Sequence, residues 1–285
     1  MRITYFGVRG SCPTSSEQQR RYGGNTSCVL VEVHDEPPLI LDMGTGLRAL
    51  GHRLNAPLVA VGKPLRGNAL LTPLHYDHVL GTPFFPPMRD PGALLEIYGP
   101  AQPDDSLQSI MAGMVQPPFF PVHMADFRGE LRYHDLEPDA EFKLGGIAVR
   151  SCAVPHVGTT LGFRIEADGV TVVYMPDHQA PVDRTTVADS VLELCQDADL
   201  LIHDSQYTEE EFVEFSDWGH STPAYAVHVA TRSGVRRLDM FHHDPGHTDR
   251  QIDTMLRAAR QIAQSNGRVE VNAAKEGGSF ELRAR

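Results

Sequence analysis

The chain has 285 residues, of which 41% are apolar and 22% charged, and its formal net charge is -12. These values are typical of a globular protein long enough to bury a substantial core, in one large domain or two small ones. The negative charge argues against a broad nucleic-acid-binding surface, which needs clustered Lys and Arg, but it does not exclude a small anionic substrate held by metal ions.

No segment indicates export or membrane insertion. The opening "MRITYFGVRGSC" alternates like a strand and lacks the regions of a signal peptide, and no run approaches the ~20 apolar residues of a membrane span. The cysteines include no CxxC pair, which argues against a disulfide framework or a cysteine zinc site. They are Cys12, Cys28, Cys152 and Cys195. We therefore expect a cytoplasmic protein without a membrane partner.

The first half of the chain is predicted to consist of short strands joined by glycine turns. Apolar or β-branched runs predict strands at residues 3–8, 28–33, 39–41, 69–72 and 94–98. Helices are expected over 47–54, after the turn "DMGTG", and over 106–114. The prolines of "QPPFFPVHM" then exclude regular structure. Residues 101–127 are either an ordered loop over a site or a surface connection with a few buried anchors.

The second half begins with strands and then alternates strands with helices. Strands are predicted at 131–134, 147–153, 161–165, 170–174, 200–203, 238–241 and 269–271, and helices at 185–195, 222–232 and 249–264. Strand-rich halves that each end in helices indicate two packed sheets with helices outside. Since no repeat or linker interrupts the chain, we expect a single domain over residues 1–285.

The stretch "TPLHYDHVLG" places two histidines and an aspartate at the end of a predicted strand. His75, Asp77 and His78 can converge around the turn that follows this strand. Nitrogen and oxygen ligands of this kind suit Zn²⁺, Mn²⁺ or Fe. The competing interpretation is a polar loop without a metal.

Other histidines and aspartates stand in equivalent places. His156 follows the strand that ends near Ala153, Asp177 the strand that ends at Tyr174, and His242 the strand that ends at Phe241. A lone histidine at one such place is more often structural. Because functional sites form where separate strand ends meet along one edge of a sheet, the repeated placement favours a shared site.

These motifs resemble the metallo-β-lactamase superfamily over nearly the whole chain. "TPLHYDHVLG" corresponds to the family's HxHxDH motif, and "LDMGTG" to its Asp-x-Gly-x-Gly turn. "YFGVRGSCPT" and "QPPFFPV" resemble a bacterial branch related to ribonuclease Z and cyclic-nucleotide phosphodiesterases. The resemblance implies an α/β (α+β) fold, a four-layer αββα sandwich with two metals at the edge between its sheets.

The resemblance also implies a ligand set and a proton donor. His75 and His156 would bind the first metal, Asp77, His78 and His242 the second, and Asp177 would bridge both, with His243 as the alternate to His242. The motif "GHST" resembles the ribonuclease Z branch, in which the histidine assists the leaving group, so His220 is an expected catalytic residue. Asp77, in the HxHxDH match, is the other. The competing role for His220 is to precede a helix capped by Ser221 or Thr222.

Three further positions are assigned supporting roles. Asp42 matches a family aspartate that orients ligands, although a turn or helix-capping role is equally compatible with its position. Asp204 is a weaker candidate for a residue that lies behind the metal ligands and orients them. Pro73 occupies the position of the family's first metal-binding histidine, and proline cannot bind a metal. The first site is thereby reduced to His75, His156 and the bridging Asp177.

The predicted function is that of a cytoplasmic metal-dependent hydrolase acting on small or nucleotide-like phosphodiesters. It would use one or two Zn²⁺ ions, with Mn²⁺ or Fe as alternatives, and no broad nucleic-acid surface is expected. A homodimer is left open. The alternative is a catalytically weak or inactive module that binds a nucleotide or a protein in the same cleft. Ester or thioester hydrolysis fits the superfamily but leaves His220 without a role.

Overall fold

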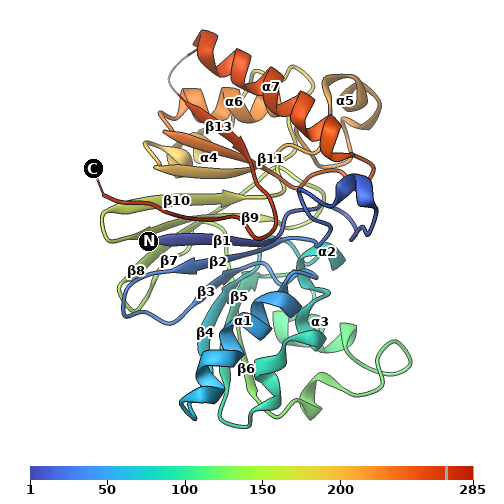
Figure 1. The fold of residues 1–285 in the computed structure, drawn as a ribbon, viewed down its shortest axis with the longest axis vertical. Coiled ribbons are helices and arrows are strands. Elements are labelled where there is room, and N and C mark those ends of the chain that lie inside the picture. The colour runs from blue at the N-terminus through green and yellow to red at the C-terminus, as the bar shows by residue number, and fades with distance from the viewer. Residues whose placement is uncertain (267–268, 285) are drawn as a thin grey trace.

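The protein is built from two β-sheets packed face to face with helices on both outer sides, as the computed structural model shows for residues 1–266 and 269–284 (Figure 1). This arrangement confirms the predicted αββα sandwich. Helices α1 and α3 lie on one side of the pair of sheets, and α4, α6 and α7 lie on the other. None of the helices in the described ranges is both long and apolar enough to cross a membrane.

The first sheet has seven strands in the order β14-β1-β2-β3-β4-β5-β6. Their bounds are β14 Ser279–Glu281, β1 Arg2–Gly7, β2 Cys28–Glu32, β3 Leu39–Leu41, β4 Arg66–Leu70, β5 Leu94–Pro100 and β6 Glu130–Leu136. Strands β3 to β6 are parallel, and the others pair antiparallel. Helices α1 (Leu47–Ala60) and α3 (Leu107–Met114) cover its outer face (Figure 1).

The second sheet also has seven strands, in the order β13-β12-β11-β10-β9-β8-β7. Their bounds are β13 Glu270–Ala273, β12 Arg237–Phe241, β11 Leu200–Asp204, β10 Val170–Met175, β9 Leu161–Ala167, β8 Ile147–Ala153 and β7 Glu141–Leu144. Strands β10 to β13 are parallel. The helices on this side are α4 Asp189–Cys195, α5 Glu209–Phe215, α6 Pro223–Arg232 and α7 Asp249–Asn266.

The core explains why the two sheets stay together. Buried residues of the first sheet, such as Val29 and Leu41, belong to the same apolar cluster as Phe163, Tyr174 and Ile202 of the second. One further apolar cluster lies between each sheet and the helices that cover it. Since burial of apolar surface is the main favourable term in folding, the shared cluster ties both halves into one unit. On this basis we propose that residues 1–285 form a single domain.

Most predicted elements are present, and the differences have local causes. Helix α1 continues past the predicted end at residue 54 and contains Pro57. Helix α5 was not expected, although Thr208 and Glu211 form a capping box at its start. Three other elements, α2 (Tyr76–Val79), β7 and β14, were also not predicted, and each is only three or four residues long. The described residues also include the short 3-10 helices η1 Glu17–Gln19, η2 Thr82–Phe84, η3 Pro86–Arg89 and η4 Met124–Asp126.

The segment 101–127 is a surface connection with buried anchors. Its helix α3 packs near β6, and Val115 and Met124 are buried in the cluster beneath the helices of the first sheet. None of its residues lines the cavity at the site described below. The sequence left open whether this segment is an ordered loop over a site or a surface connection. The structure therefore supports the surface connection.

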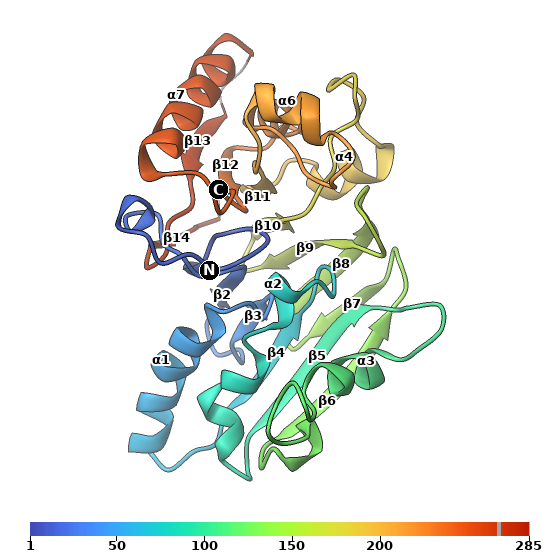
Figure 2. The ribbon, with the colours of Figure 1, turned by 90° about the vertical axis from the view of Figure 1, so that its right-hand side faces the viewer.

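The strand ends that carry the predicted ligands meet along one edge of the sandwich. Strands β8, β10, β11 and β12 run in the same direction, because β9 is antiparallel to both β8 and β10. Figure 2 looks toward this edge, with α2 near the centre where the two sheets approach each other. The topology thus brings segments that are far apart in the sequence to one place.

Candidate metal centre

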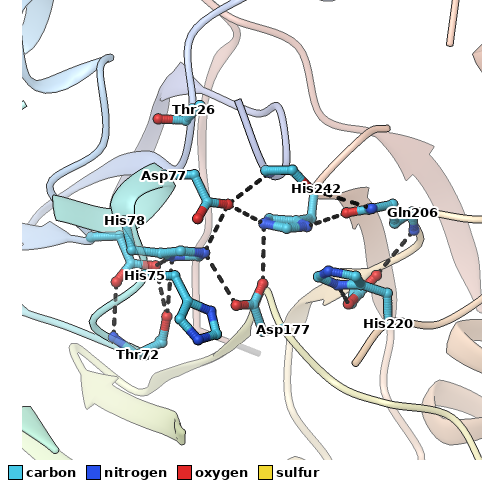
Figure 3. A network of polar contacts seen from close by, with 12 residues as sticks. Thr26, Thr72, His75, Asp77, His78, Asp177, Gln206, His220 and His242 are labelled. Atoms are coloured by element: carbon cyan, nitrogen blue, oxygen red, sulfur yellow. Dashed lines mark hydrogen bonds and ion pairs between the residues drawn. The ribbon is translucent and has the colours of Figure 1, made fainter. Parts of the chain in front are cut away.

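The six residues predicted as metal ligands lie together at this edge, from both sheets. Figure 3 labels five of them, all except His156. His75 caps the N-terminus of α2, and Asp77 and His78 lie within it. The other three follow β8, β10 and β12, and they are His156, Asp177 and His242. His78, Asp177 and His242 are almost fully buried, so the centre is set into the protein rather than spread over its surface.

The first ligand group consists of His75, His156 and Asp177, whose nitrogen and oxygen atoms lie within 4.8 Å of one another. The Nε2 atom of His156 is 3.3 Å from Asp177 Oδ2 and 3.3 Å from His75 Nδ1. Two imidazoles and one carboxylate are a donor set that suits a divalent transition metal.

The second group consists of Asp77, His78 and His242, again within 4.8 Å. His242 Nε2 lies 3.0 Å from Asp77 Oδ2 and 3.1 Å from Asp177 Oδ1. His78 Nε2 lies 3.3 Å from Asp77 Oδ2 and 3.2 Å from Asp177 Oδ2. Asp177 therefore contacts both groups, with Oδ2 facing His156 and His78 and Oδ1 facing His242.

The chemistry of these atoms fits divalent cations. His78 Nε2 and Asp177 Oδ1 are buried and make no hydrogen bond, although both point into the cluster. A buried polar atom without a partner is costly, and a bound ion would satisfy it. Burial raises the pKa of Asp77, but the neighbouring His78 and His242 outweigh this effect and hold that pKa well below its usual value. The cluster therefore presents ionised carboxylates.

The charges of the cluster also shift the pKa of His78. Burial lowers the pKa of His78, but the carboxylates of Asp177, Asp77 and Asp42 raise it well above the usual value. Negative groups that hold a proton on a buried imidazole would also attract a cation into that place. Metal binding would displace this proton, because the ligand form of histidine is the neutral ring.

Outer partners fix the orientation of the ligands. His78 Nδ1 lies 2.8 Å from Asp42 Oδ2, and the same carboxylate accepts hydrogen bonds from the Thr72 amide and the Tyr174 hydroxyl, each at 2.8 Å. Asp42 is at φ +57°, and Gly46, not Asp42, precedes helix α1. The orienting role expected from the family resemblance is thus the one the structure supports, since such partners fix the tautomer and direction of a ligand.

Two other partners were not foreseen. His242 Nδ1 lies 2.8 Å from Gln206 Oε1, and His156 Nδ1 lies 2.6 Å from the carbonyl oxygen of Gly219. Gln206 follows the end of β11, so the rule applied to histidines and aspartates at strand ends would have found it had amides been included. A backbone carbonyl partner leaves no sequence signal.

His220 lies beside the cluster and outside the two groups described above, although it forms a further possible metal-holding set with Asp177, Asp204 and His242, whose ligand atoms lie within 4.8 Å of one another. Its ring stacks on His242 with 4.9 Å between centroids, and it is 5.3 Å from the ring of His156. His220 Nδ1 is 2.8 Å from Asp204 Oδ2. Burial lowers the pKa of His220, but Asp204 and then Asp177 and Asp77 raise it to about 9, so the ring is protonated at neutral pH.

The remaining histidines considered for the site point elsewhere. His243 Nε2 lies 2.9 Å from the Ala274 carbonyl, and its ring packs against Tyr22. His178 Nδ1 lies 2.8 Å from His203 Nε2 in the interior. The structure therefore places His242, not its alternate, in the cluster. Among the residues it describes, neither His178 nor His203 belongs to a metal-ligand group.

The ligands surround one end of a cavity of about 610 Å³. Residues His75, Asp77, His156, Asp177 and His220 line it together with Ser11, Leu74, Tyr76, Val157 and Trp218. The amide of Ser11 donates a 2.7 Å hydrogen bond to Asp77 Oδ2. The volume of this cavity is within the range of ~300–1,000 Å³ usual for ligand pockets, so four of the six candidate ligands and His220 share a space that can hold a substrate.

Comparison with known proteins identifies the family. A family model described as a beta-lactamase superfamily domain matches residues 39–243, and the chain belongs to the metallo-β-lactamase superfamily. It is 26% identical over 324 residues to a ribonuclease Z of Natronomonas pharaonis, covering 95% of this chain and 98% of that protein. A ribonuclease Z of Mycobacterium tuberculosis strain H37Rv is 28% identical over 244 residues, covering 81% and 84%. The protein is thus a metallo-β-lactamase hydrolase related to ribonuclease Z.

Solved structures show the same fold. The metallo-beta-lactamase fold protein YhfI of Bacillus subtilis has a TM-score of 0.70 at 20% identity, covering 99% of this chain and 98% of that one. Human tRNase Z, short form, has a TM-score of 0.67 at 20% identity, covering 99% of each chain. Yeast PDE1 has a TM-score of 0.70 at 14% identity, also covering 99% of each.

One expectation from the sequence is wrong. The net charge led us to expect a small phosphodiester as partner and no broad nucleic-acid surface. The relatives matched over most of their length are ribonucleases, and a structural neighbour is a tRNase. Net charge is a sum over the whole surface, and it does not register a local site in which metal ions supply the positive charge.

Proposed function

We propose that the protein is a zinc-dependent phosphodiesterase that hydrolyses RNA. The observation that carries this proposal is the His220–Asp204 pair beside the ligand cluster, because hydrolysis of a phosphodiester needs a proton for its departing oxygen. The ribonuclease Z relatives support RNA as the substrate class.

Two groups of residues would hold the ions. His75 and His156 would bind the first and Asp77, His78 and His242 the second, with Asp177 shared between them. Imidazole and carboxylate ligands suit Zn²⁺, and Mn²⁺ or Fe would be held by the same donors. Bound ions would polarise the phosphoryl group, neutralise developing charge and lower the pKa of water toward neutrality.

The side chains would donate the proton to the leaving group and orient the attacking water. Asp204 lies at Nδ1 of His220, which leaves Nε2 as the nitrogen that can donate a proton to the leaving oxygen. The stacking of His220 on His242 keeps this proton next to the ligand cluster. Asp77 lines the cavity with its Oδ2 held by the Ser11 amide, and we assign to it the orientation of the attacking water.

The test measures the metal content of the protein and its cleavage of RNA. Purified protein would be loaded with Zn²⁺, and a labelled transfer-RNA precursor with a 3′ extension would be incubated with it beside bis(p-nitrophenyl) phosphate. The expected result is site-specific RNA cleavage that a chelator abolishes and Zn²⁺ restores. Variant His220→Ala should retain metal, and His228→Ala, at a half-buried histidine on α6 outside the metal-ligand groups, is the matched control.

A different outcome would support the competing function. A protein that binds the RNA or a nucleotide but cleaves neither substrate at full metal content would be the catalytically weak binding module. We also propose a cytoplasmic location, supported by the four cysteines, which are all free in the structure. Fractionation of the cells that make the protein would test it.

A further inference from the structure

The mouth of the catalytic cavity is apolar and aromatic, which the metal chemistry does not require. Beside the ligands, the cavity is lined by Leu74, Tyr76, Val157 and Trp218. Trp218 is 62% exposed and Tyr76 is 71% exposed. Tryptophan is on average highly buried in proteins, and a contiguous exposed apolar patch rimmed by polar residues commonly marks a binding surface. The cavity therefore offers aromatic faces next to the place where a phosphodiester would be bound.

Trp218 is held in a fixed position relative to the reacting groups. Its amide donates a 3.0 Å hydrogen bond to the Phe215 carbonyl, and its ring lies 4.9 Å from the ring of Phe215. The next residue, Gly219, offers its carbonyl oxygen to His156 at 2.6 Å. His220 follows directly. The loop that carries Trp218 is thus tied to a metal ligand and to the assigned proton donor.

We infer that Trp218 stacks on one unpaired nucleobase of the substrate, the base adjoining the phosphodiester that is cut. This inference rests on the proposed function, since metal ions would hold the phosphate and leave the attached base near the cavity mouth. Bases stack on aromatic side chains without regard to sequence, because every base has a π-face. Tyr76 supplies a second aromatic side chain to the same cavity.

The inference has a consequence for specificity. A base inside a helix has both faces covered by its neighbours, so it can stack on Trp218 only after leaving the helix. The enzyme should therefore prefer a cut site with an unpaired adjoining nucleotide, and it should tolerate any of the four bases there. Removal of the base, not its exchange, should weaken binding.

The protein contains a single tryptophan, so its intrinsic indole fluorescence reports on this position alone. Zinc-loaded protein would be titrated with adenosine 5′-monophosphate and, separately, with ribose 5-phosphate. The two probes share the phosphate and the sugar and differ in the base. Saturable quenching by the nucleotide at concentrations where ribose 5-phosphate has no effect is expected. Equal responses to both probes would overturn the inference.

Variants separate stacking from general apolar contact. Trp218→Ala should raise KM for the RNA roughly 5- to 150-fold, the range that corresponds to loss of one stacked base, with little change in kcat. Trp218→Phe should recover much of this loss, whereas Trp218→Leu should not. The control is Val213→Ala, which removes an apolar side chain that is 76% exposed on α5 and does not line the cavity.

The outcomes also distinguish this inference from the proposed function. RNA cleavage with an unchanged KM in Trp218→Ala would refute the stacking role and leave the hydrolase intact. Quenching by the nucleotide without cleavage of any RNA would refute the hydrolase and retain the base-binding site. Recovery by Trp218→Leu equal to that by Trp218→Phe would show an apolar contact and refute stacking. Metal content and circular dichroism of each variant establish that it is folded.

Discussion

The two metal sites should differ in affinity, because they differ in the number of protein ligands. The first offers His75, His156 and the shared Asp177, whereas the second offers Asp77, His78, His242 and the same Asp177. Pro73 stands where the superfamily motif has a histidine, and it has no donor atom. We predict that the wild-type protein holds its first metal more weakly than its second.

The expected magnitude follows from this ligand count. Loss of a hydrogen-bonding partner behind a ligand usually costs ~10–100-fold in metal affinity, and loss of a ligand itself should cost at least as much. That range corresponds to about 1.4–2.8 kcal/mol. Protein dialysed against a graded series of chelators should therefore lose one equivalent of metal well before the other.

The variant Pro73→His tests the cause of the difference. If the new imidazole reaches the site, the weaker equivalent should resist chelation more strongly, and activity should rise with occupancy. The substitution also removes the fixed φ of proline near -65°, so the melting temperature should be measured beside metal content. Pro64→His, outside the metal-ligand groups, is the matched control for exchanging a proline for a histidine.

A clear result would refute this reasoning. Two metals held with equal affinity in the wild type, together with no gain in Pro73→His, would mean that another donor completes the first site. His178 is a poor candidate for that donor, because its Nδ1 is paired with His203 Nε2 at 2.8 Å. Solvent, which commonly completes three-ligand zinc sites, and His220, which shares a possible metal-holding group with Asp177, would then be the donors to test.

Four further variants test the same centre. Asp177→Ala should abolish both metal retention and hydrolysis, because its two oxygens face both ligand groups; full metal occupancy in this variant, measured by atomic absorption, would contradict the bridging assignment. His220→Ala should keep its metal and lose roughly 10²–10⁴-fold in turnover on substrates with poor leaving groups, and much less with p-nitrophenol as leaving group; equal losses would show that it donates no proton. Gly219→Ala should weaken the first site selectively, because the residue is at φ +95° and a Cβ there would lie 2.5 Å from the Nδ1 and Cε1 atoms of His156. Its counterpart Gly10→Ala should weaken the second site, since its Cβ would overlap the ring of His242, and the same chelator series would show which equivalent each variant loses.

The sequence alone was sufficient for most of the elements and for the segments that carry the candidate ligands. Apolar alternation depends on neighbours two residues apart, so strands such as β3 and β8 were predicted with their exact bounds. A motif such as "HYDH" is likewise local. The short elements α2 and β14 were missed because each contains few apolar residues, whereas β3, which is as short as β14, is entirely apolar.

The sequence could also indicate that separate strand ends would share a site, but not which atoms meet there. The choice of His242 over its neighbour His243 depends on the backbone after β12, where His242 is at φ +58° and turns its ring into the cluster. His243 instead reaches the Ala274 carbonyl. Adjacent residues with the same chemistry are distinguished only by the direction in which the backbone points them.

Tertiary structure alone decided the support and the surroundings of the site. Asp42 and Tyr174, which are 132 residues apart in the chain, meet behind His78 because the two sheets face each other. The exposure of Trp218 at the cavity mouth likewise has no sequence signal, since tryptophan in a sequence is more often a core residue. Local pattern determines which segments form strands and which carry ligands. Contacts between distant segments depend on the packing of the whole chain, which no local pattern contains.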